Sequence, residues 1–224
     1  MAEKGVVVEF DFAVLDGAKL LFETAKGFLE GLDKIALDKV LEARYLAGSG
    51  YLDGLTRLFA FVKTKKTPQK AARELSAAFC AAVTAALPKA AAGVSFRNFV
   101  KALSDRGVHV VISTRADPAV AQQALEPLVG ENVSIYQEVS DLYGSVRWDA
   151  WRRACMSAKL RHMSTLAITG SGSGVKSALV AGMGSVAVAN DHVAYQDFGG
   201  ASDVVGDLSG KTAKKVLHVL GLDA

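Results

Sequence analysis

Cysteine is scarce in this chain. Its 224 residues include only Cys80 and Cys155, both in apolar stretches with helical spacing. Two isolated cysteines build neither a disulfide framework nor a cysteine-ligated metal site, so a reducing compartment is the expected environment. We expect both to be small buried hydrophobic residues rather than nucleophiles.

A large charge excess and long apolar runs are also missing. The chain has 26 lysines and arginines against 23 aspartates and glutamates, a formal net charge of +3, which gives no reason to expect nucleic-acid binding. No run reaches the ~20 apolar residues needed to cross a bilayer. The N-terminus enters an apolar strand directly, without the pattern of a secretory signal. We therefore expect a cytoplasmic protein that binds neither membranes nor nucleic acid.

Hydrophobic residues make up 50% of the chain, enough for a substantial core, and their periodicity changes along the sequence. Val6–Phe10 form a short β-branched run typical of a buried strand. From residue 17 to about residue 92, apolar residues recur only at helical spacing. Breaks divide this segment into about four helices. The pattern predicts a helical insertion without strands.

Later in the chain, runs of strand length alternate with helical stretches. Further strands are expected at Val108–Ile112, Val133–Tyr136, Leu166–Ile168, Val186–Val188 and, as a short sixth strand, Val204–Val205. Strands that alternate with helices need crossover connections, which favours a parallel sheet covered on both faces. The predicted fold is an α/β doubly wound parallel sheet with an inserted helical segment. Ligands of such sheets bind at the carboxyl ends of the strands.

The first strand and its exit read Val-Val-Val-Glu9-Phe10-Asp11-Phe12-Ala13-Val14-Leu15-Asp16. This segment resembles the first motif of the haloacid dehalogenase superfamily, in which Asp-x-Asp-Gly-Thr-Leu and a downstream acid follow an apolar strand. Asp11 and Asp16 match the motif. Glu9 stands where the family has its nucleophilic aspartate, and Phe12-Ala13 replace Gly-Thr.

The other family motifs align further along the chain. Val108-His109-Val110-Val111-Ile112-Ser113-Thr114 resembles the second motif, an apolar strand that ends in threonine or serine. Gly174-Val175-Lys176-Ser177-Ala178 and Ala181-Gly182-Met183 resemble the fourth motif, and this alignment places Gly170 where the family has an acid. The lysine of the third motif falls on Ser145, and Arg147 is the only nearby cation.

The resemblance covers the whole chain and implies its organisation. Residues 1–16 and 93–224 are expected to form a Rossmann-like α/β core. Residues 17–92 take the place of a helical cap, as in the β-phosphoglucomutase and phosphonatase-like subgroup.

The resemblance also implies roles for individual side chains. Glu9 and Asp11 correspond to the catalytic pair: the first attacks phosphorus, a covalent route open to carboxylates, and the second transfers protons. The same two residues would hold a magnesium ion. Ser113, Thr114 and Arg147 would bind phosphate.

Three of the four chemical positions have changed, which predicts impaired catalysis. Glu9 is one methylene longer than aspartate, and a displacement of ~1 Å can cost ~10²-fold in rate. Gly170 removes a carboxylate from a metal that relies on few protein ligands. We therefore expect weak or absent magnesium binding. Structural roles are open as well: Glu9 could pair with a backbone amide or an arginine, and Asp16 could be a helix N-cap.

The residues leave three functional hypotheses open. The first is a hydrolase-fold protein with impaired catalysis that binds a phosphorylated small molecule or a partner. The second is an active phosphatase or phosphomutase in which Glu9 attacks and another acid, such as Asp191, completes the metal site. The third is a non-catalytic interaction protein. The changed motif positions favour the first.

Overall fold

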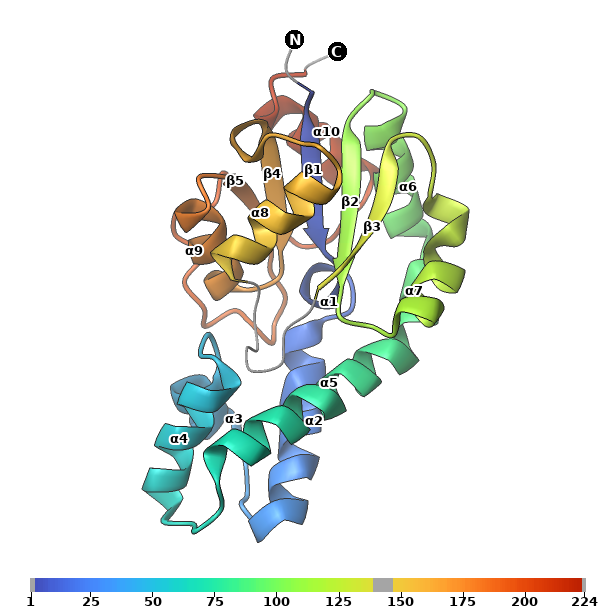
Figure 1. Cartoon of the computed structure of the whole chain (residues 1–224). Helices are drawn as coiled ribbons and strands as arrows, with labels where there is room; N and C mark the ends of the chain where they lie inside the picture. Colours follow the sequence, from blue (N-terminus) through green and yellow to red (C-terminus); the bar gives the residue numbers. More distant parts are fainter. Residues whose placement is uncertain (1–2, 139–146, 223–224) are drawn as a thin grey trace.

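The computed structural model describes residues 3–138 and 147–222, and its centre is a parallel β-sheet. The sheet has six strands in the order β3-β2-β1-β4-β5-β6. They are β1 (Gly5–Glu9), β2 (His109–Thr114), β3 (Val133–Gln137), β4 (Thr165–Thr169), β5 (Gly184–Val188) and β6 (Asp203–Val205). All neighbouring strands pair in parallel, and Figure 1 shows helices in front of and behind the sheet. The predicted doubly wound parallel sheet, its short sixth strand included, is confirmed.

The two faces of the sheet are covered by different helices. These are α6 (Val94–Ser104), α7 (Pro118–Leu125), α8 (Trp148–Ser157), α9 (Gly172–Val180) and α10 (Gly210–Val219). Successive side chains of a strand point to opposite faces. Val6 and Val8 therefore join the core cluster that contains α6 and α10, whereas Val7 joins Trp151 of α8 on the other face. All three valines are fully buried, because this central strand is covered on both faces of the sheet.

Between β1 and β2 the chain is helical, as its periodicity predicts. The elements are α1 (Phe10–Ala13), α2 (Gly17–Asp33), α3 (Lys39–Leu41), the π-helical turn η1 (Glu42–Leu46), α4 (Tyr51–Val62) and α5 (Pro68–Ala91). In Figure 1, α2, α4 and α5 lie below the carboxyl ends of the central strands. The helical cap of the predicted fold is therefore present.

Some predicted details are wrong. The first strand ends at Glu9, because Phe10 already begins the one-turn helix α1. Asp16 is not a side-chain N-cap: its backbone has a left-handed φ of 52°, and its Oδ1 instead accepts a hydrogen bond from Asn190 Nδ2 at 2.9 Å. Helix α7 ends at Leu125, and a 3₁₀ turn, η2 (Glu126–Leu128), follows it.

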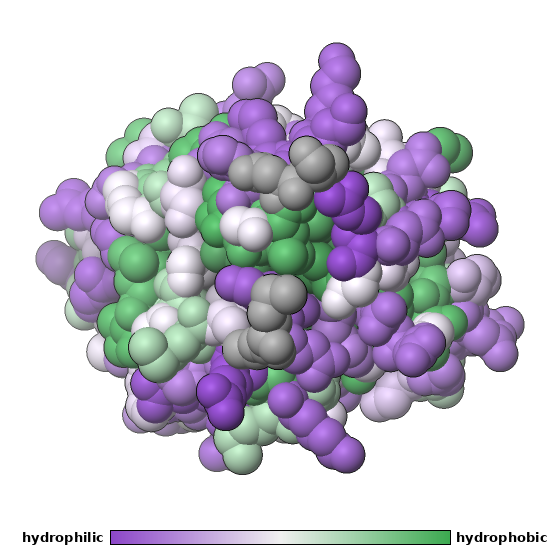
Figure 2. All heavy atoms as spheres, turned by 90° about the horizontal axis from the view of Figure 1, so that it is seen from above, coloured by the Kyte–Doolittle hydropathy of each residue, from purple (hydrophilic) through white to green (hydrophobic). Residues whose placement is uncertain are grey.

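Within residues 3–138 and 147–222, no single helix is long and apolar enough to cross a bilayer. Among the described residues, only α5 and α6 together have the necessary length and composition, and they are bent by 74° relative to each other. Figure 2 shows the end of the molecule opposite α4, where hydrophobic residues gather near the centre and hydrophilic residues surround them.

Candidate functional site

Three neighbouring strands bring polar side chains to one edge of the sheet. β1 ends at Glu9, β2 at Thr114 and β4 at Thr169. Because these strands are adjacent and parallel, their last residues lie at the same carboxyl edge, where such sheets bind ligands. The turn α1 adds Asp11, and Ser113 lies beside Glu9 in the strand register. The structure thus brings four of the predicted site residues together, all of them buried.

Asp11 is held by three hydrogen bonds from the end of β2. Thr114 Oγ1 donates to Asp11 Oδ1 at 2.6 Å. The backbone N–H of Arg115 donates to Asp11 Oδ2 at 2.9 Å, and Arg115 Nη1 donates to the same oxygen at 3.2 Å. Burial raises the pKa of Asp11 above its usual value, although the Arg115 guanidinium opposes this shift. The Thr114 hydroxyl, predicted to bind phosphate, is therefore engaged by Asp11.

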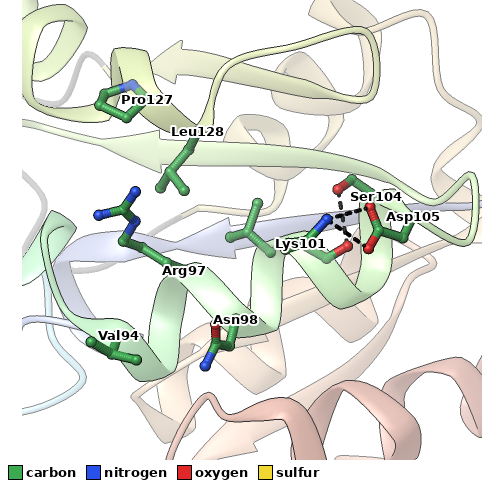
Figure 3. A pocket seen from close by; sticks show the side chains of 9 residues that line it. Val94, Arg97, Asn98, Lys101, Ser104, Asp105, Pro127 and Leu128 are labelled. Carbon is green, nitrogen blue, oxygen red and sulfur yellow. Dashed lines mark hydrogen bonds and ion pairs between the residues drawn. The ribbon is translucent and has the colours of Figure 1, made fainter.

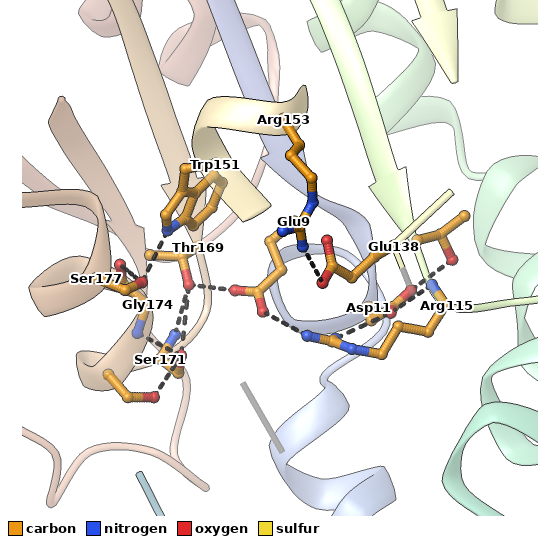
Figure 4. A network of polar contacts seen from close by, with 12 residues as sticks. Glu9, Asp11, Arg115, Glu138, Trp151, Arg153, Thr169, Ser171, Gly174 and Ser177 are labelled. Atoms are coloured by element: carbon orange, nitrogen blue, oxygen red, sulfur yellow. Dashed lines mark hydrogen bonds and ion pairs between the residues drawn. The ribbon is translucent and has the colours of Figure 1, made fainter. Parts of the chain in front are cut away.

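Arg115 lies between the two carboxylates of the site. Its Nη1 is 3.2 Å from Asp11 Oδ2, and its Nη2 is 3.9 Å from Glu9 Oε1. Figure 4 shows the guanidinium reaching across toward Glu9. Burial opposes the positive charge, but Asp11 and Glu9 outweigh it and raise the pKa of Arg115. Only 5% of this residue is exposed, so Arg115 acts as a buried counter-ion.

Glu9 is also tied to the neighbouring strand. Its Oε2 accepts a hydrogen bond from Thr169 Oγ1, as Figure 4 shows. In the glycine-rich segment after Thr169, two backbone amides donate hydrogen bonds to side chains of the protein. Gly174 N–H donates to Ser171 Oγ at 3.0 Å, and Gly172 N–H donates to Gln196 Oε1 at 2.8 Å. These two amides are therefore engaged by side chains of the chain itself.

Gly170, at the position of the fourth-motif acid, has no space for a side chain. A Cβ atom built there would overlap the backbone carbonyl of Phe12 in α1. Phe12 follows Asp11 directly, so the same turn that places Asp11 also closes the space above Gly170. Any acid at position 170 would require a backbone shift.

A magnesium ion of the kind that the family resemblance implies does not fit these residues. Glu9 and Asp11 already face a guanidinium, and Gly170 offers no third carboxylate. Within residues 3–138 and 147–222, no three histidine, cysteine or acidic side chains form a group suited to a metal. Asp191 is exposed and lines a cavity with Lys39 and Val40. A cation ligated by Glu9 and Asp11 would have to displace Arg115.

The remaining predicted residues lie elsewhere or outside the described part. Arg147, at the start of α8, pairs with Asp149 at 3.2 Å, and 44% of its side chain is exposed. Ser145 lies outside the described residues. The catalytic and phosphate-binding roles of Glu9, Asp11, Ser113, Thr114 and Arg147 stay predictions.

Glu138 extends the polar network beyond the predicted residues. It follows β3 and is 6% exposed, and its Oε1 lies 3.9 Å from Arg153 Nη2 of α8. Burial raises the pKa of Glu138, and Arg115 and Arg153 oppose the shift. Its place directly after a strand was the one available signal in the sequence. The same signal applies to Arg115, which follows the second-motif strand.

The cavity beside α6 is not lined by a pair of buried carboxylates like Glu9 and Asp11. A cavity of about 430 Å³ lies between α6 and η2, where Arg97 lies near Leu128 and the Lys101 ammonium points toward Asp105 (Figure 3). Lys101 forms a 3.0 Å surface ion pair with Asp105, and exposed pairs of this kind contribute little. The carboxyl edge of the sheet remains the candidate site.

Comparison with solved structures decides the fold. A phosphonoacetaldehyde hydrolase like protein from Oleispira antarctica superposes with a TM-score of 0.71 at 14% identity, covering 98% of this chain and 94% of that one. β-Phosphoglucomutase from Clostridium difficile gives 0.66 at 13% identity, with 98% and 97% covered. CbbY from Rhodobacter sphaeroides, solved with phosphate, gives 0.64 at 14% identity, with 93% and 95% covered. The chain has the haloacid dehalogenase fold.

These solved structures share the fold of the chain and are of the β-phosphoglucomutase and phosphonatase type that its motifs resemble. No family model matches the chain, and no curated protein matches its sequence. At these identities the likeness concerns the fold, and the chemistry has to be argued from the side chains of this chain.

Gly170→Ala should destabilise the protein. The added methyl group meets the Phe12 backbone, and overpacking of this kind costs about 1–3 kcal/mol. Gly27→Ala is the matched control, because nothing lies within 4 Å of a Cβ atom at Gly27. In the middle of α2 this change should stabilise by about 0.5–1 kcal/mol. Urea unfolding of both variants measures the difference, and equal stability of the two would contradict the steric argument.

Magnesium should not bind with measurable affinity. Titration calorimetry of the wild type with millimolar magnesium chloride is expected to give no saturable heat, because Arg115 already pairs with Glu9 and Asp11. Sodium chloride at equal ionic strength controls for salt effects. A saturable heat specific to magnesium would show that the carboxylates can exchange the guanidinium for a metal.

Proposed function

We propose that this chain is a phosphatase-fold protein that binds a phosphorylated small molecule, or a partner, without efficient turnover. The observation that carries the proposal is Arg115, buried between Glu9 and Asp11. Phosphoryl transfer depends on an in-line nucleophile and on cations that neutralise the phosphate oxygens. Among the described residues, Arg115 is the only cation that contacts both carboxylates. It pairs with these carboxylates and not with a phosphate group.

The hydrogen bonds around the carboxylates support the same proposal. Asp11 accepts three hydrogen bonds, and a group with this many partners is poorly placed to exchange protons with a substrate. Glu9 accepts from Thr169 and lies close to Arg115, so an attack by its carboxylate would first break these contacts. Both groups therefore act more as structural anchors than as a free catalytic pair.

The class of ligand is proposed from the fold neighbours. CbbY was solved with phosphate, and a CbbY variant was solved with xylulose-(1,5)-bisphosphate. These ligands belong to those proteins, and they support a phosphorylated small molecule as the first candidate here.

We also propose that residues 17–92 act as the cap over this site. Phe79 of α5 packs against Phe12 of α1, with ring centroids 5.8 Å apart, so α5 lies beside the turn that carries Asp11. This contact supports a covering role for the segment.

Turnover of phosphate esters should be close to background. The wild type and Glu9→Gln are compared on p-nitrophenyl phosphate and a panel of sugar phosphates with magnesium. We expect both to be equally inactive, because Glu9 is already engaged. At least one phosphorylated compound should nevertheless raise the melting temperature of the wild type.

Two results would count against the proposal. Robust wild-type turnover that disappears in Glu9→Gln would establish an active phosphatase that uses Glu9 as its nucleophile. An absence of both turnover and thermal protection across the panel would replace the small-molecule ligand with a protein partner.

A further inference from the structure

Helices α8 and α9 and the 3₁₀ turn η3 (His162–Ser164) carry exposed apolar side chains on one side of the sheet. Met156 of α8 is 73% exposed, Met163 of η3 is 84% exposed and Val180 of α9 is 67% exposed. Single exposed apolar residues are normal on a protein surface, but a group of them with a polar rim marks an interaction site. The arrangement of these three residues therefore decides their meaning.

The elements that carry these side chains contact one another. Figure 1 shows α8 and α9 on the same side of the sheet, and both contribute to the same hydrophobic cluster. Arg152 Nε of α8 donates to the backbone carbonyl of Ala181, directly after α9, at 3.2 Å. The turn η3 lies beside this end of α9, because a Cβ atom built at Gly182 would be 3.5 Å from the His162 ring. These elements form what we call the α8–α9 face: Arg152, Met156, Lys159, Arg161, Met163 and Val180.

The charged residues of the α8–α9 face have one sign. No aspartate or glutamate occurs from residue 150 to residue 190, whereas this stretch contains five lysines and arginines. Two of the five pair with acids outside the stretch. The other three, Arg152, Lys159 and Arg161, form no ion pair with any residue that the structure describes. The face thus combines exposed apolar side chains with positive charges that lack an acidic partner.

One of the three cations is held in place. The Arg152 guanidinium lies 5.4 Å from the centroid of the Trp148 ring, and its hydrogen bond to Ala181 fixes its other side. Trp148 is itself 44% exposed, so a molecule that reaches Arg152 also meets the indole. Tryptophan, methionine and arginine are enriched in protein–protein interfaces, and a pre-oriented arginine loses little side-chain entropy on binding. The composition of the α8–α9 face is therefore that of a protein interface.

We propose that the α8–α9 face binds a partner protein through an amphipathic segment that carries acidic and apolar side chains. The apolar side of the segment covers the two methionines and the valine, and its carboxylates pair with the three cations. Such charge complementarity speeds association and selects the partner. The inference goes beyond the proposed function and does not depend on it, because this face is exposed whereas Glu9 and Asp11 are buried at the strand ends.

Two other occupants fit the α8–α9 face less well. A second copy of the chain, joined through the same face about a two-fold axis, would bring the cations of both copies together, and like charges repel. An anionic membrane attracts three basic residues only weakly, because each contributes little and stable attachment needs a second signal. An acidic protein segment supplies both the carboxylates and the apolar cover.

The test uses the full chain and synthetic helical peptides without tryptophan. One peptide has leucine on one side and glutamate on the other, and a second has lysine in place of every glutamate. Tryptophan fluorescence reports binding, because Trp148 is exposed whereas Trp151 is buried, and Trp148→Phe should remove the signal. The acidic peptide should give a saturable change whose midpoint rises with added salt. The lysine peptide should give none.

Charge reversal tests the role of the cations. The double variant Lys159→Glu, Arg161→Glu should weaken binding of the acidic peptide at least about tenfold, since two attractions become repulsions. Lys65→Glu, Lys66→Glu is the matched control, because it makes the same change of net charge at two exposed residues of the cap segment. This control should bind like the wild type. All four side chains are exposed, so equal melting temperatures should show that both variants fold.

Met163→Ser tests the apolar contribution. It should weaken binding about three- to tenfold, because apolar area that the peptide covers is lost. Val94→Ser is the control: Val94 is 72% exposed and lies on α6, which packs on the other face of the sheet. It should leave binding unchanged.

Several results would overturn the proposal. The acidic peptide could give no saturable change, the lysine peptide could bind equally well, or charge reversal at positions 159 and 161 could leave binding unchanged. Binding of phosphatidylserine vesicles in place of the acidic peptide would assign the face to a membrane. A dimer that Met163→Ser dissociates would assign it to a second copy of the chain.

Discussion

Glu9 and Asp11 are buried together with Arg115, and the rest of the site depends on this contact. An isolated charge in a protein interior is strongly disfavoured, and carboxylates tolerate burial only when they are paired and hydrogen-bonded. Arg115 supplies the opposite charge, and Thr114 and Thr169 supply hydrogen bonds from the ends of the two strands that flank β1. The ion pairs therefore connect β1, α1 and the end of β2 in one unit.

The changes at the site depend on one another. Gly170 supplies no third carboxylate beside Glu9 and Asp11. Arg115 supplies a positive charge beside Glu9 and Asp11, and the Phe12 backbone occupies the space beside Gly170. Restoring one element alone, such as an acid at position 170, meets both a steric conflict with the Phe12 backbone and a competing internal cation. A binding role fits this arrangement better than metal-dependent turnover.

The sequence predicts the scaffold well because the scaffold depends on periodicity. Val6, Val7 and Val8 must be apolar for burial on both faces, and the helical spacing between residues 17 and 92 has no strand-like alternation. The site is harder to predict, because a pairing between residues 9, 11 and 115 is a tertiary contact. An arginine after a strand is ordinarily solvated, and no local pattern shows that Arg115 turns inward. The same holds for Thr169 and Glu138, whereas Glu9 and Asp11 were found through their motif.

A double-mutant cycle on Asp11 and Arg115 tests the central claim most directly. The free energy of unfolding is measured for the wild type, Asp11→Asn, Arg115→Met and the double variant by urea denaturation. Each single change should cost about 3–5 kcal/mol, because it leaves a buried charge without its partner. The double variant should cost at least about 2 kcal/mol less than the sum, since the two charges leave together. Additive costs, within about 0.5 kcal/mol, would contradict the claim that Arg115 serves as the counter-ion of this site.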